Sequence, residues 1–133
     1  MNEPSEDQIV CAFLVRDGRA LLVHRAAERV RRPNVWDAPG GHIDAGETAA
    51  QGLVREIKEE LGVDIAPPAG EPALRTRVGD TDVSVWIVDE WTGDPRNAAP
   101  DEHDAIGWFG LAEITDLNIV SDAHRRLLER LLG

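Results

Sequence analysis

The segment GHIDAGETAAQGLVREIKEELGV, residues 41–63, predicts a glycine-containing loop followed by an amphipathic helix. Thr48 and Gln51 match a capping box, and Gly62 suits the left-handed conformation that ends many helices. We therefore expect a helix over residues 49–61. Its apolar side chains share one face and would pack against a core, namely Ala50, Leu53, Val54, Ile57 and Leu61.

Three glutamates of this helix share a second face. Glu56, Glu59 and Glu60 stand at i, i+3 and i+4, where side chains are neighbours on a helix surface. Like charges at this spacing destabilise a helix by roughly 0.2–0.5 kcal/mol per pair, so a surface helix gains nothing from them. A divalent cation removes the repulsion, and carboxylate oxygens are ligands that suit Mg²⁺ or Mn²⁺. The pattern predicts a site for Mg²⁺ or Mn²⁺.

The same segment resembles the Nudix box, the signature of the Nudix hydrolases. That signature is G, five residues, E, seven residues and REUxEExGU, where U is aliphatic, and every fixed position is filled here. The matching residues are Gly41, Glu47, Arg55, Glu56, Ile57, Glu59, Glu60, Gly62 and Val63. The preceding stretch, residues 36–41, resembles the W-x-x-P-G-G lead-in common in this family. The resemblance implies an α/β fold, a sandwich with a mixed β-sheet between helices.

The resemblance also implies a reaction, the hydrolysis of a nucleoside diphosphate linked to another group. Phosphoryl transfer needs cations to neutralise charge and a carboxylate to orient or deprotonate water, which agrees with the acidic helix. At this length we expect a (d)NTP or an oxidised (d)NTP to be cleaved to a nucleoside monophosphate and pyrophosphate. The alternatives are an ADP-ribose or nucleotide-sugar pyrophosphatase and a nucleotide-binding sensor without turnover.

Site roles follow from the same pattern. We expect Glu56, Glu59 and Glu60 to be metal ligands, and the resemblance adds the carbonyl of Gly40. Arg55 lies one turn before Glu59 and is expected to orient it by a charge-assisted hydrogen bond. Glu47 is expected to be a second orienting partner.

The acidic loop 101–104 resembles the place where many Nudix enzymes contribute one further glutamate. Glu102 is the best match for that glutamate. The alternative is a solvated acidic loop. Whether Glu56 or this loop supplies the general base stays open.

A positive patch precedes the box. It comprises His24, Arg25, Arg29, Arg31 and Arg32. Because the guanidinium fork matches phosphate oxygens, Arg25, Arg29 and Arg32 are candidates for substrate binding. The alternative is a loop of solvated charges.

Length and charge bound the remaining possibilities. A chain of 133 residues with 42% hydrophobic content is expected to form a single Nudix hydrolase domain, residues 1–133. Its 14 Lys and Arg against 25 Asp and Glu give a net charge of −11, which disfavours nucleic acid and anionic membranes as partners. The expected partner is a small nucleotide. A homodimer remains open.

The N-terminal segment MNEPSEDQ lacks the features of a signal peptide, so a cytoplasmic location is expected. The single cysteine, Cys11, allows no intrachain disulfide and is expected to be a small buried residue in a strand. The four tryptophans are expected to fill the core rather than stack on a base.

Apolar runs and turn residues predict the other elements. A strand over residues 9–15 should turn at Asp17 and Gly18 into a second strand around 21–23. Further strands are expected over 73–78, 83–89 and 106–109, with a helical turn over 111–116 and a final helix capped by Ser121.

Overall fold

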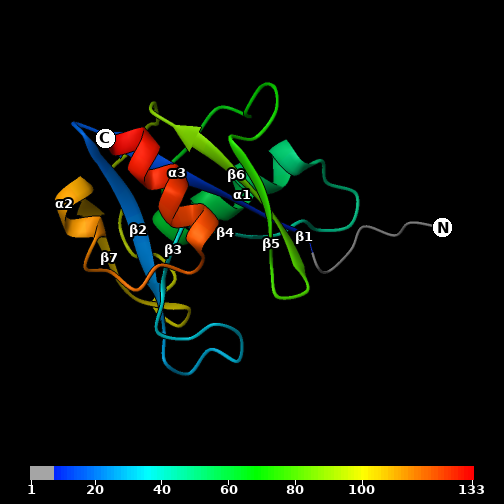
Figure 1. The fold of residues 1–133 in the computed structure, drawn as a ribbon. Coiled ribbons are helices and arrows are strands. Elements are labelled where there is room, and N and C mark those ends of the chain that lie inside the picture. Colours follow the sequence, from blue (N-terminus) through cyan, green and yellow to red (C-terminus); the bar gives the residue numbers. More distant parts are fainter. Residues whose placement is uncertain (1–7) are drawn as a thin grey trace.

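The computed structural model describes residues 8–133, so most of the segment used to argue against a signal peptide lies outside the described residues. The elements are, in chain order, β1 (Gln8–Arg16), β2 (Arg19–Arg25), β3 (Trp36–Asp37), β4 (Gly40–His42), α1 (Ala49–Leu61), β5 (Leu74–Val78), β6 (Thr81–Val88), β7 (His103–Phe109), α2 (Leu111–Ile114) and α3 (Asp122–Leu132). Figure 1 shows their arrangement.

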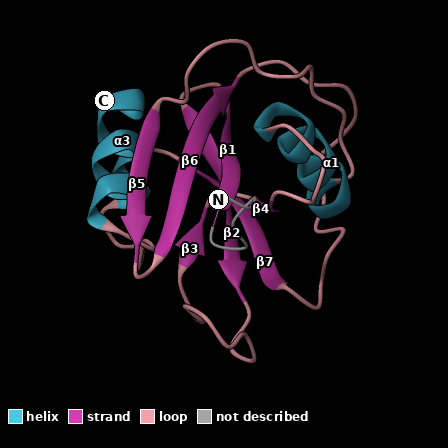
Figure 2. Ribbon diagram, turned by 90° about the vertical axis from the view of Figure 1, so that its right-hand side faces the viewer, coloured by secondary structure: helices cyan, strands magenta, loops and turns pink. Residues whose placement is uncertain are grey.

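The strands form one mixed sheet with β1 at its centre. The order is β3-β2-β1-β6-β5, with β4 also paired to β1 and β7 paired to β2. β1 and β6 run parallel, whereas the other pairs are antiparallel. Helix α1 covers one face of the sheet and α3 covers the other (Figure 2). The expected sandwich of helices around a mixed sheet is confirmed.

The first hairpin forms where the sequence predicted it. β1 and β2 pair antiparallel, with Arg16 opposite Arg19. Asp17 and Gly18 connect them with positive φ angles of 54° and 73°. Two successive residues of this kind give the turn whose twist matches paired strands, and Asp-Gly is a preferred sequence for it.

Strand β1 is apolar without alternation because both of its faces are covered. Residues 10–14 are all buried. Cys11 and Phe13 pack into the core under α3, whereas Val10, Ala12 and Leu14 pack into the core under α1. Cys11 is 2% exposed, as expected for a small buried residue.

Helix α1 begins and ends at the predicted residues. Thr48 Oγ1 accepts the Gln51 N–H, and the Gln51 side chain accepts the Thr48 N–H. Gly62 caps the other end in a left-handed conformation with φ 72°. Leu53, Ile57 and Leu61 are fully buried in the core under α1. This packing sets the rotation of the helix and so aims its glutamates.

Helix α3 also matches its prediction. Ser121 Oγ accepts the backbone N–H of His124 and caps the helix. Leu127 and Leu128 are buried against the sheet. The tryptophans pack against the two cores, as expected, and Trp91 stacks on Trp108 with ring centroids 5.9 Å apart.

Several strand boundaries differ from those expected. β6 begins at Thr81, and β7 begins at His103, so the second half of the acidic loop 101–104 belongs to a strand. Two short strands in the lead-in, β3 and β4, were not predicted. Neither has an apolar run because each is only a few residues long and rests on pairing with β2 or β1.

No helix among residues 8–133 combines the length and apolar character needed to cross a bilayer.

Candidate active site

The three glutamates of α1 have different environments. Glu60 is 2% exposed. Its Oε1 accepts the backbone N–H of Gly40 at 2.9 Å. Glu56 is partly buried, and its side chain is 14% exposed, whereas that of Glu59 is 57% exposed. The glutamate face therefore runs from the protein interior at Glu60 to solvent at Glu59.

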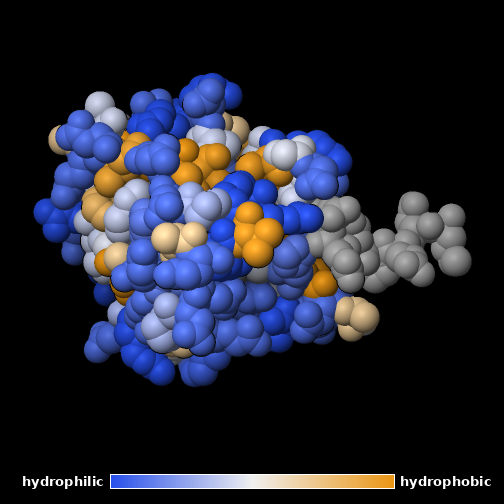
Figure 3. All heavy atoms as spheres, turned by 90° about the horizontal axis from the view of Figure 1, so that it is seen from below, coloured by the Kyte–Doolittle hydropathy of each residue, from blue (hydrophilic) through white to orange (hydrophobic). Residues whose placement is uncertain are grey.

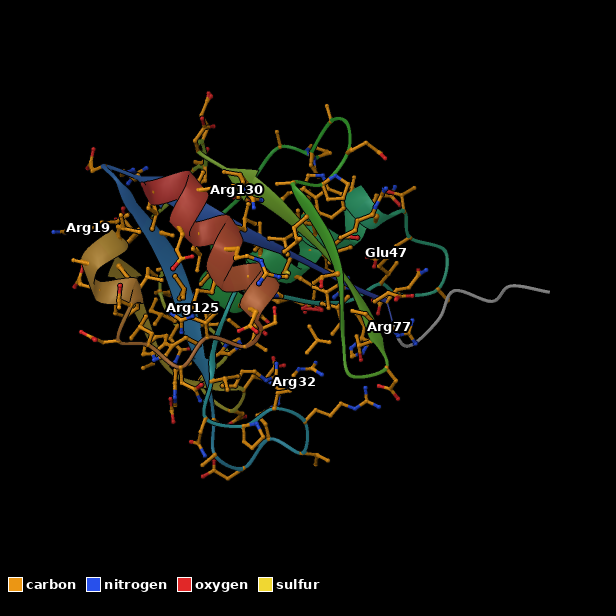
Figure 4. All side chains as sticks on the ribbon, viewed as in Figure 1. Arg19, Arg32, Glu47, Arg77, Arg125 and Arg130 are labelled. Carbon is orange, nitrogen blue, oxygen red and sulfur yellow. The ribbon has the colours of Figure 1, made fainter. Side chains whose placement is uncertain are left out.

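Arg55 links the glutamates to the loop before the helix. Its Nε and Nη2 donate to the two carboxylate oxygens of Glu47 at 2.7 and 3.0 Å, and Nη2 also donates to the carbonyl of His42 at 2.9 Å. Its Nη1 lies 3.2 Å from the carboxylates of both Glu56 and Glu59. Figure 4 shows Glu47 near the N-terminal end of α1.

Burial determines the electrostatics of the two inner glutamates. Burial raises the pKa of Glu56 to about 7, against the lowering influence of Arg55. Burial also raises the pKa of Glu60, reinforced by the negative charges of Glu56 and Glu102. The hydrogen bond from Arg55 instead lowers the pKa of Glu47. Burial thus disfavours the ionised forms of both inner glutamates, while Arg55 makes its two-point contact with Glu47.

The backbone allows Glu56 to come close to the loop. A Cβ added at Gly41 would overlap the Glu56 carboxylate. Glycine at this position therefore lets the side chain of Glu56 lie flat against the strand. Gly40 donates its N–H to Glu60, and the role of its carbonyl as a metal ligand stays a prediction.

In this conformation the predicted ligands do not form a complete metal-binding cluster. Within residues 8–133, no group of three or more His, Cys, Asp or Glu side chains is arranged to hold a metal ion. Arg55 separates Glu56 from Glu59, and Glu59 does not line the cavity described below. Glu56 and Glu60 remain the acids of α1 that face this cavity.

A cavity of about 430 Å³ lies beside these two glutamates. Its volume is within the range of about 300–1,000 Å³ typical of small-molecule sites. The polar and charged lining residues are Arg25, Arg29, Arg31, Arg32, Asp37, His42, Asp44, Glu56, Glu60, Glu102, His103 and His124. All three arginines proposed from the sequence, and Glu102, therefore line the same cavity as Glu56 and Glu60. Glu47 and Arg55 are not among the lining residues.

The arginine loop, residues 26–35, forms one rim of the cavity. Arg25 donates through Nε and Nη2 to the carbonyls of Arg31 and Arg32, which holds the loop in place. Arg29 pairs with Glu102 at 3.5 Å. Arg31 reaches the start of β6, where it donates to Thr81 Oγ1 at 3.2 Å. Figure 3 views the molecule from the side of this loop and shows a mostly hydrophilic face with small hydrophobic patches.

His103 is a cavity residue to which the sequence assigned no role. It is 3% exposed, and its Nε2 lies 3.8 Å from Glu60 Oε1. Burial, followed by the positive charge of Arg29, lowers its pKa to about 4, so the ring is neutral near pH 7. In the sequence it stands between two acids, which gives no sign of burial, and strand β7 turns it inward.

Asp37 and His124 were also not foreseen as cavity residues. Asp37 lies in β3, and His124 lies in the first turn of α3 with 1% exposure. His124 Nε2 and Asp37 Oδ1 are 3.7 Å apart. The two residues are distant in the sequence, and no local pattern connects them.

Comparison with known proteins identifies the family. The NUDIX domain family matches residues 6–131. A Mycobacterium tuberculosis protein provisionally named 8-oxo-dGTP diphosphatase 2 is 36% identical over 124 residues, which span 86% of this chain and 81% of that protein. The CTP pyrophosphohydrolase of Escherichia coli is 29% identical over 103 residues, 76% of this chain and 73% of that protein.

A solved structure agrees with this assignment. The crystal structure of a MutT NUDIX hydrolase from Burkholderia pseudomallei matches with a TM-score of 0.74 and 28% identity, over 96% of this chain and 98% of the other. The box residues, the fold and the matched family model agree on one family. The chain belongs to the NUDIX domain family and is a Nudix hydrolase.

Proposed function

We propose that the protein cleaves the pyrophosphate linkage of a nucleoside triphosphate, including oxidised deoxynucleoside triphosphates, to give a nucleoside monophosphate and pyrophosphate with Mg²⁺ or Mn²⁺. The observation that carries this proposal is that Glu56 and Glu60 face one cavity together with a cluster of arginines. Acids suited to a cation and cations suited to phosphate thus line the same space. The names of the relatives reported above support the same substrate class.

The residues present fit a divalent cation. Glu56 and Glu60 are carboxylates whose pKa values are raised by burial, so their ionised forms are disfavoured without a positive charge nearby. Mg²⁺ uses one or two carboxylates and keeps waters and substrate phosphates as its other ligands, so an incomplete protein cluster is no obstacle. Glu56 and Glu60 would hold the ion, with Glu102 at the same cavity. Bound there, it would supply charge neutralisation for the phosphate oxygens.

Arg55 is the positioning residue of this site. Through Glu47 and the carbonyl of His42 it is fixed to the loop, and through Nη1 it holds Glu56 and Glu59. A bidentate guanidinium contact sets both distance and plane, which a single ammonium contact does not. We assign Glu59 to this network, as a carboxylate that aligns Arg55 and is available to a cation after a side-chain rotation.

Arg29 is the arginine best placed to bind the phosphates. Its side chain lines the cavity and makes a long ion pair of 3.5 Å with Glu102. Arg25 is less available because two loop carbonyls engage it. We therefore assign phosphate binding to Arg29 and support of the loop to Arg25.

The general base is Glu102 or Glu56. Glu102 is half exposed and lines the cavity, where water can reach it. Glu56 is more buried and also lines the cavity, and it could act as the base only where it does not bind the cation. Single substitutions decide between them.

The test is a screen of nucleoside triphosphates, 8-oxo-dGTP, ADP-ribose and nucleotide sugars with Mg²⁺ and with Mn²⁺, with the products separated by chromatography. A nucleoside monophosphate plus pyrophosphate from a triphosphate is the expected result, and chelator should abolish it. Faster cleavage of ADP-ribose or a nucleotide sugar would replace the proposed substrate class. Binding of nucleotides without turnover of any of them would indicate a sensor.

A further inference from the structure

The cavity extends beyond the box glutamates to the N-terminal end of α3. The walls of this second end, which we call the α3 end, are apolar and come from β1, β5, β6 and the segment before α3. They are formed by Ile9, Cys11, Val78, Val83 and Val120. Neither metal binding nor phosphate binding uses an apolar surface of this kind. The flat ring of a nucleobase, another part of a nucleotide, can pack against such an apolar surface.

Three polar side chains face the α3 end. Asp37 comes from β3, His124 from α3 and Arg32 from the arginine loop. Figure 4 shows Arg32 between that loop and the lower end of α3. Buried polar atoms are almost always hydrogen-bonded. Within residues 8–133, however, His124 Nε2 and Arg32 Nε are buried without a partner. Of the two, His124 Nε2 faces the Asp37 carboxylate at 3.7 Å, whereas Arg32 Nε is left for a ligand to satisfy.

His124 is arranged to orient Asp37. Burial lowers the pKa of His124, opposed by the negative charge of Asp37 and supported by the positive charge of Arg32, so its ring carries one proton near pH 7. The Asp37 carboxylate 3.7 Å from Nε2 favours the tautomer with that proton on Nε2. Ser121 Oγ, 2.6 Å from Nδ1, then donates its hydroxyl proton to Nδ1.

The Asp37 carboxylate keeps acceptor capacity for a ligand. Its Oδ1 accepts the backbone N–H of Ala38 at 2.7 Å. A carboxylate has about four acceptor positions and no donor, so most of its capacity is free. The α3 end therefore presents adjacent acceptors from Asp37 and a donor from Arg32.

We propose that Asp37 is the base-selecting residue of the substrate site, that it favours a guanine-type base, and that His124 positions it. This inference rests on the proposed function, because it places the base of the same nucleotide. The Watson–Crick edge of guanine carries two adjacent donors, N1–H and the 2-amino group, which match a carboxylate in a bidentate contact. Its neighbouring O6 is an acceptor for Arg32.

The other bases match this set less well. Adenine and cytosine place a ring acceptor beside their amino group, and that acceptor would face the carboxylate. Thymine and uracil have one ring N–H between two carbonyl oxygens. A bidentate base contact discriminates by about 1–3 kcal/mol, which corresponds to roughly a 5- to 150-fold difference in affinity.

Binding of mononucleotides without metal tests this proposal separately from catalysis. The affinities of dGMP, dIMP, dAMP, dCMP and dTMP are measured by calorimetry for the wild type, for Asp37→Asn and for Asp122→Asn. Asp122 is an exposed acid of the same helix turn as His124 and does not line the cavity, so it is the matched control. Thermal melting checks that each variant is folded.

We expect the wild type and Asp122→Asn to bind dGMP about 5- to 150-fold more tightly than dAMP, with dIMP between them because it lacks the 2-amino group. Asp37→Asn should lose this preference, since the amide places a donor where guanine needs an acceptor. His124→Gln, which keeps a donor toward Asp37, should retain more of the preference than His124→Leu.

Equal affinity of the wild type for dGMP and dAMP, or an unchanged preference in Asp37→Asn, would overturn the proposal. So would equal binding of dGMP and dIMP, because the bidentate contact would then be absent. A preference for dGMP that depends on Asp37, in a protein that hydrolyses no nucleotide, would support base selection and refute the proposed hydrolysis.

Discussion

The two ends of the cavity are assembled in different ways. At the end beside the glutamates of α1, which we call the box end, Glu56 and Glu60 come from one helix. Their positioning partner Arg55 lies on the same helix. At the α3 end, Asp37 and His124 come from a short strand and from the last helix. Local spacing therefore predicts the box end, whereas the α3 end exists only once the sheet has brought distant segments together.

This difference separates two kinds of function. The box end concentrates acids, and its substitutions should act on metal binding and on kcat. The α3 end has apolar walls with a few polar atoms, and its substitutions should act on KM and on the choice of base. The predictions below test whether the two ends can be separated in this way.

The largest effect is expected for Glu60→Gln. This substitution removes a charge but keeps the volume and an oxygen that can accept the Gly40 N–H. We expect kcat to be nearly abolished with the fold retained, because Glu60 is a proposed metal ligand and the loss of a mere partner of a ligand already costs about 10- to 100-fold. Steady-state kinetics and circular dichroism measure both.

Glu71→Gln is the matched control for that substitution, because the Glu71 side chain is 79% exposed and lies outside the cavity. A Glu60→Gln enzyme with the kcat of the control would remove Glu60 from the metal site.

Glu102→Gln should have the next largest effect if Glu102 is the base. A general base contributes a factor on the order of 10²–10⁴, so kcat should fall within this range. Asp101→Asn is the neighbouring control, because Asp101 does not line the cavity. If rapid kinetics show normal rates for both variants, Glu102 is excluded as the general base, and Glu56 is the remaining candidate for that role.

Arg55→Lys should weaken metal binding. Lysine keeps the charge but cannot reach Glu47, Glu56 and His42 at once. We expect the Mn²⁺ concentration for half-maximal activity to rise about 10- to 100-fold. Arg75→Lys, on exposed strand β5, serves as the control. An unchanged Mn²⁺ requirement in Arg55→Lys would contradict the positioning role.

The smallest effect is expected from metal alone. A cation that binds the folded state at 100 times its dissociation constant stabilises it by about 2.7 kcal/mol, so Tm should rise by several degrees at millimolar Mg²⁺ or Mn²⁺. The scan should be repeated with a non-hydrolysable nucleotide, because the phosphates complete the site. A Tm that is the same with and without metal and nucleotide would count against a site built by Glu56 and Glu60.

Much of the fold and half of the candidate site could be predicted from the sequence. The limits of α1, its caps and the first hairpin follow from local signals such as Thr48, Gln51, Gly62 and the Asp17–Gly18 turn. The short strands β3 and β4 could not be predicted, because their pairing with β2 and β1 is a tertiary property.

About half of the candidate site could be predicted from the sequence. The glutamates and Arg55 are marked by spacing along one helix. Their unequal burial is not, since the rotation of α1 depends on how Leu53 and Ile57 pack under the sheet. The inward turn of His103 likewise depends on the pairing of β7 with β2.

The most direct test of the account is the binding of Mn²⁺ measured by electron paramagnetic resonance in the presence of a non-hydrolysable triphosphate. Three proteins are compared, the wild type, Glu60→Gln at the box end and Asp37→Asn at the α3 end, each at nucleotide saturation. The account predicts that Glu60→Gln binds Mn²⁺ much more weakly than the wild type, whereas Asp37→Asn needs more nucleotide but then binds Mn²⁺ as the wild type does. Equal Mn²⁺ affinity in Glu60→Gln and the wild type would contradict it.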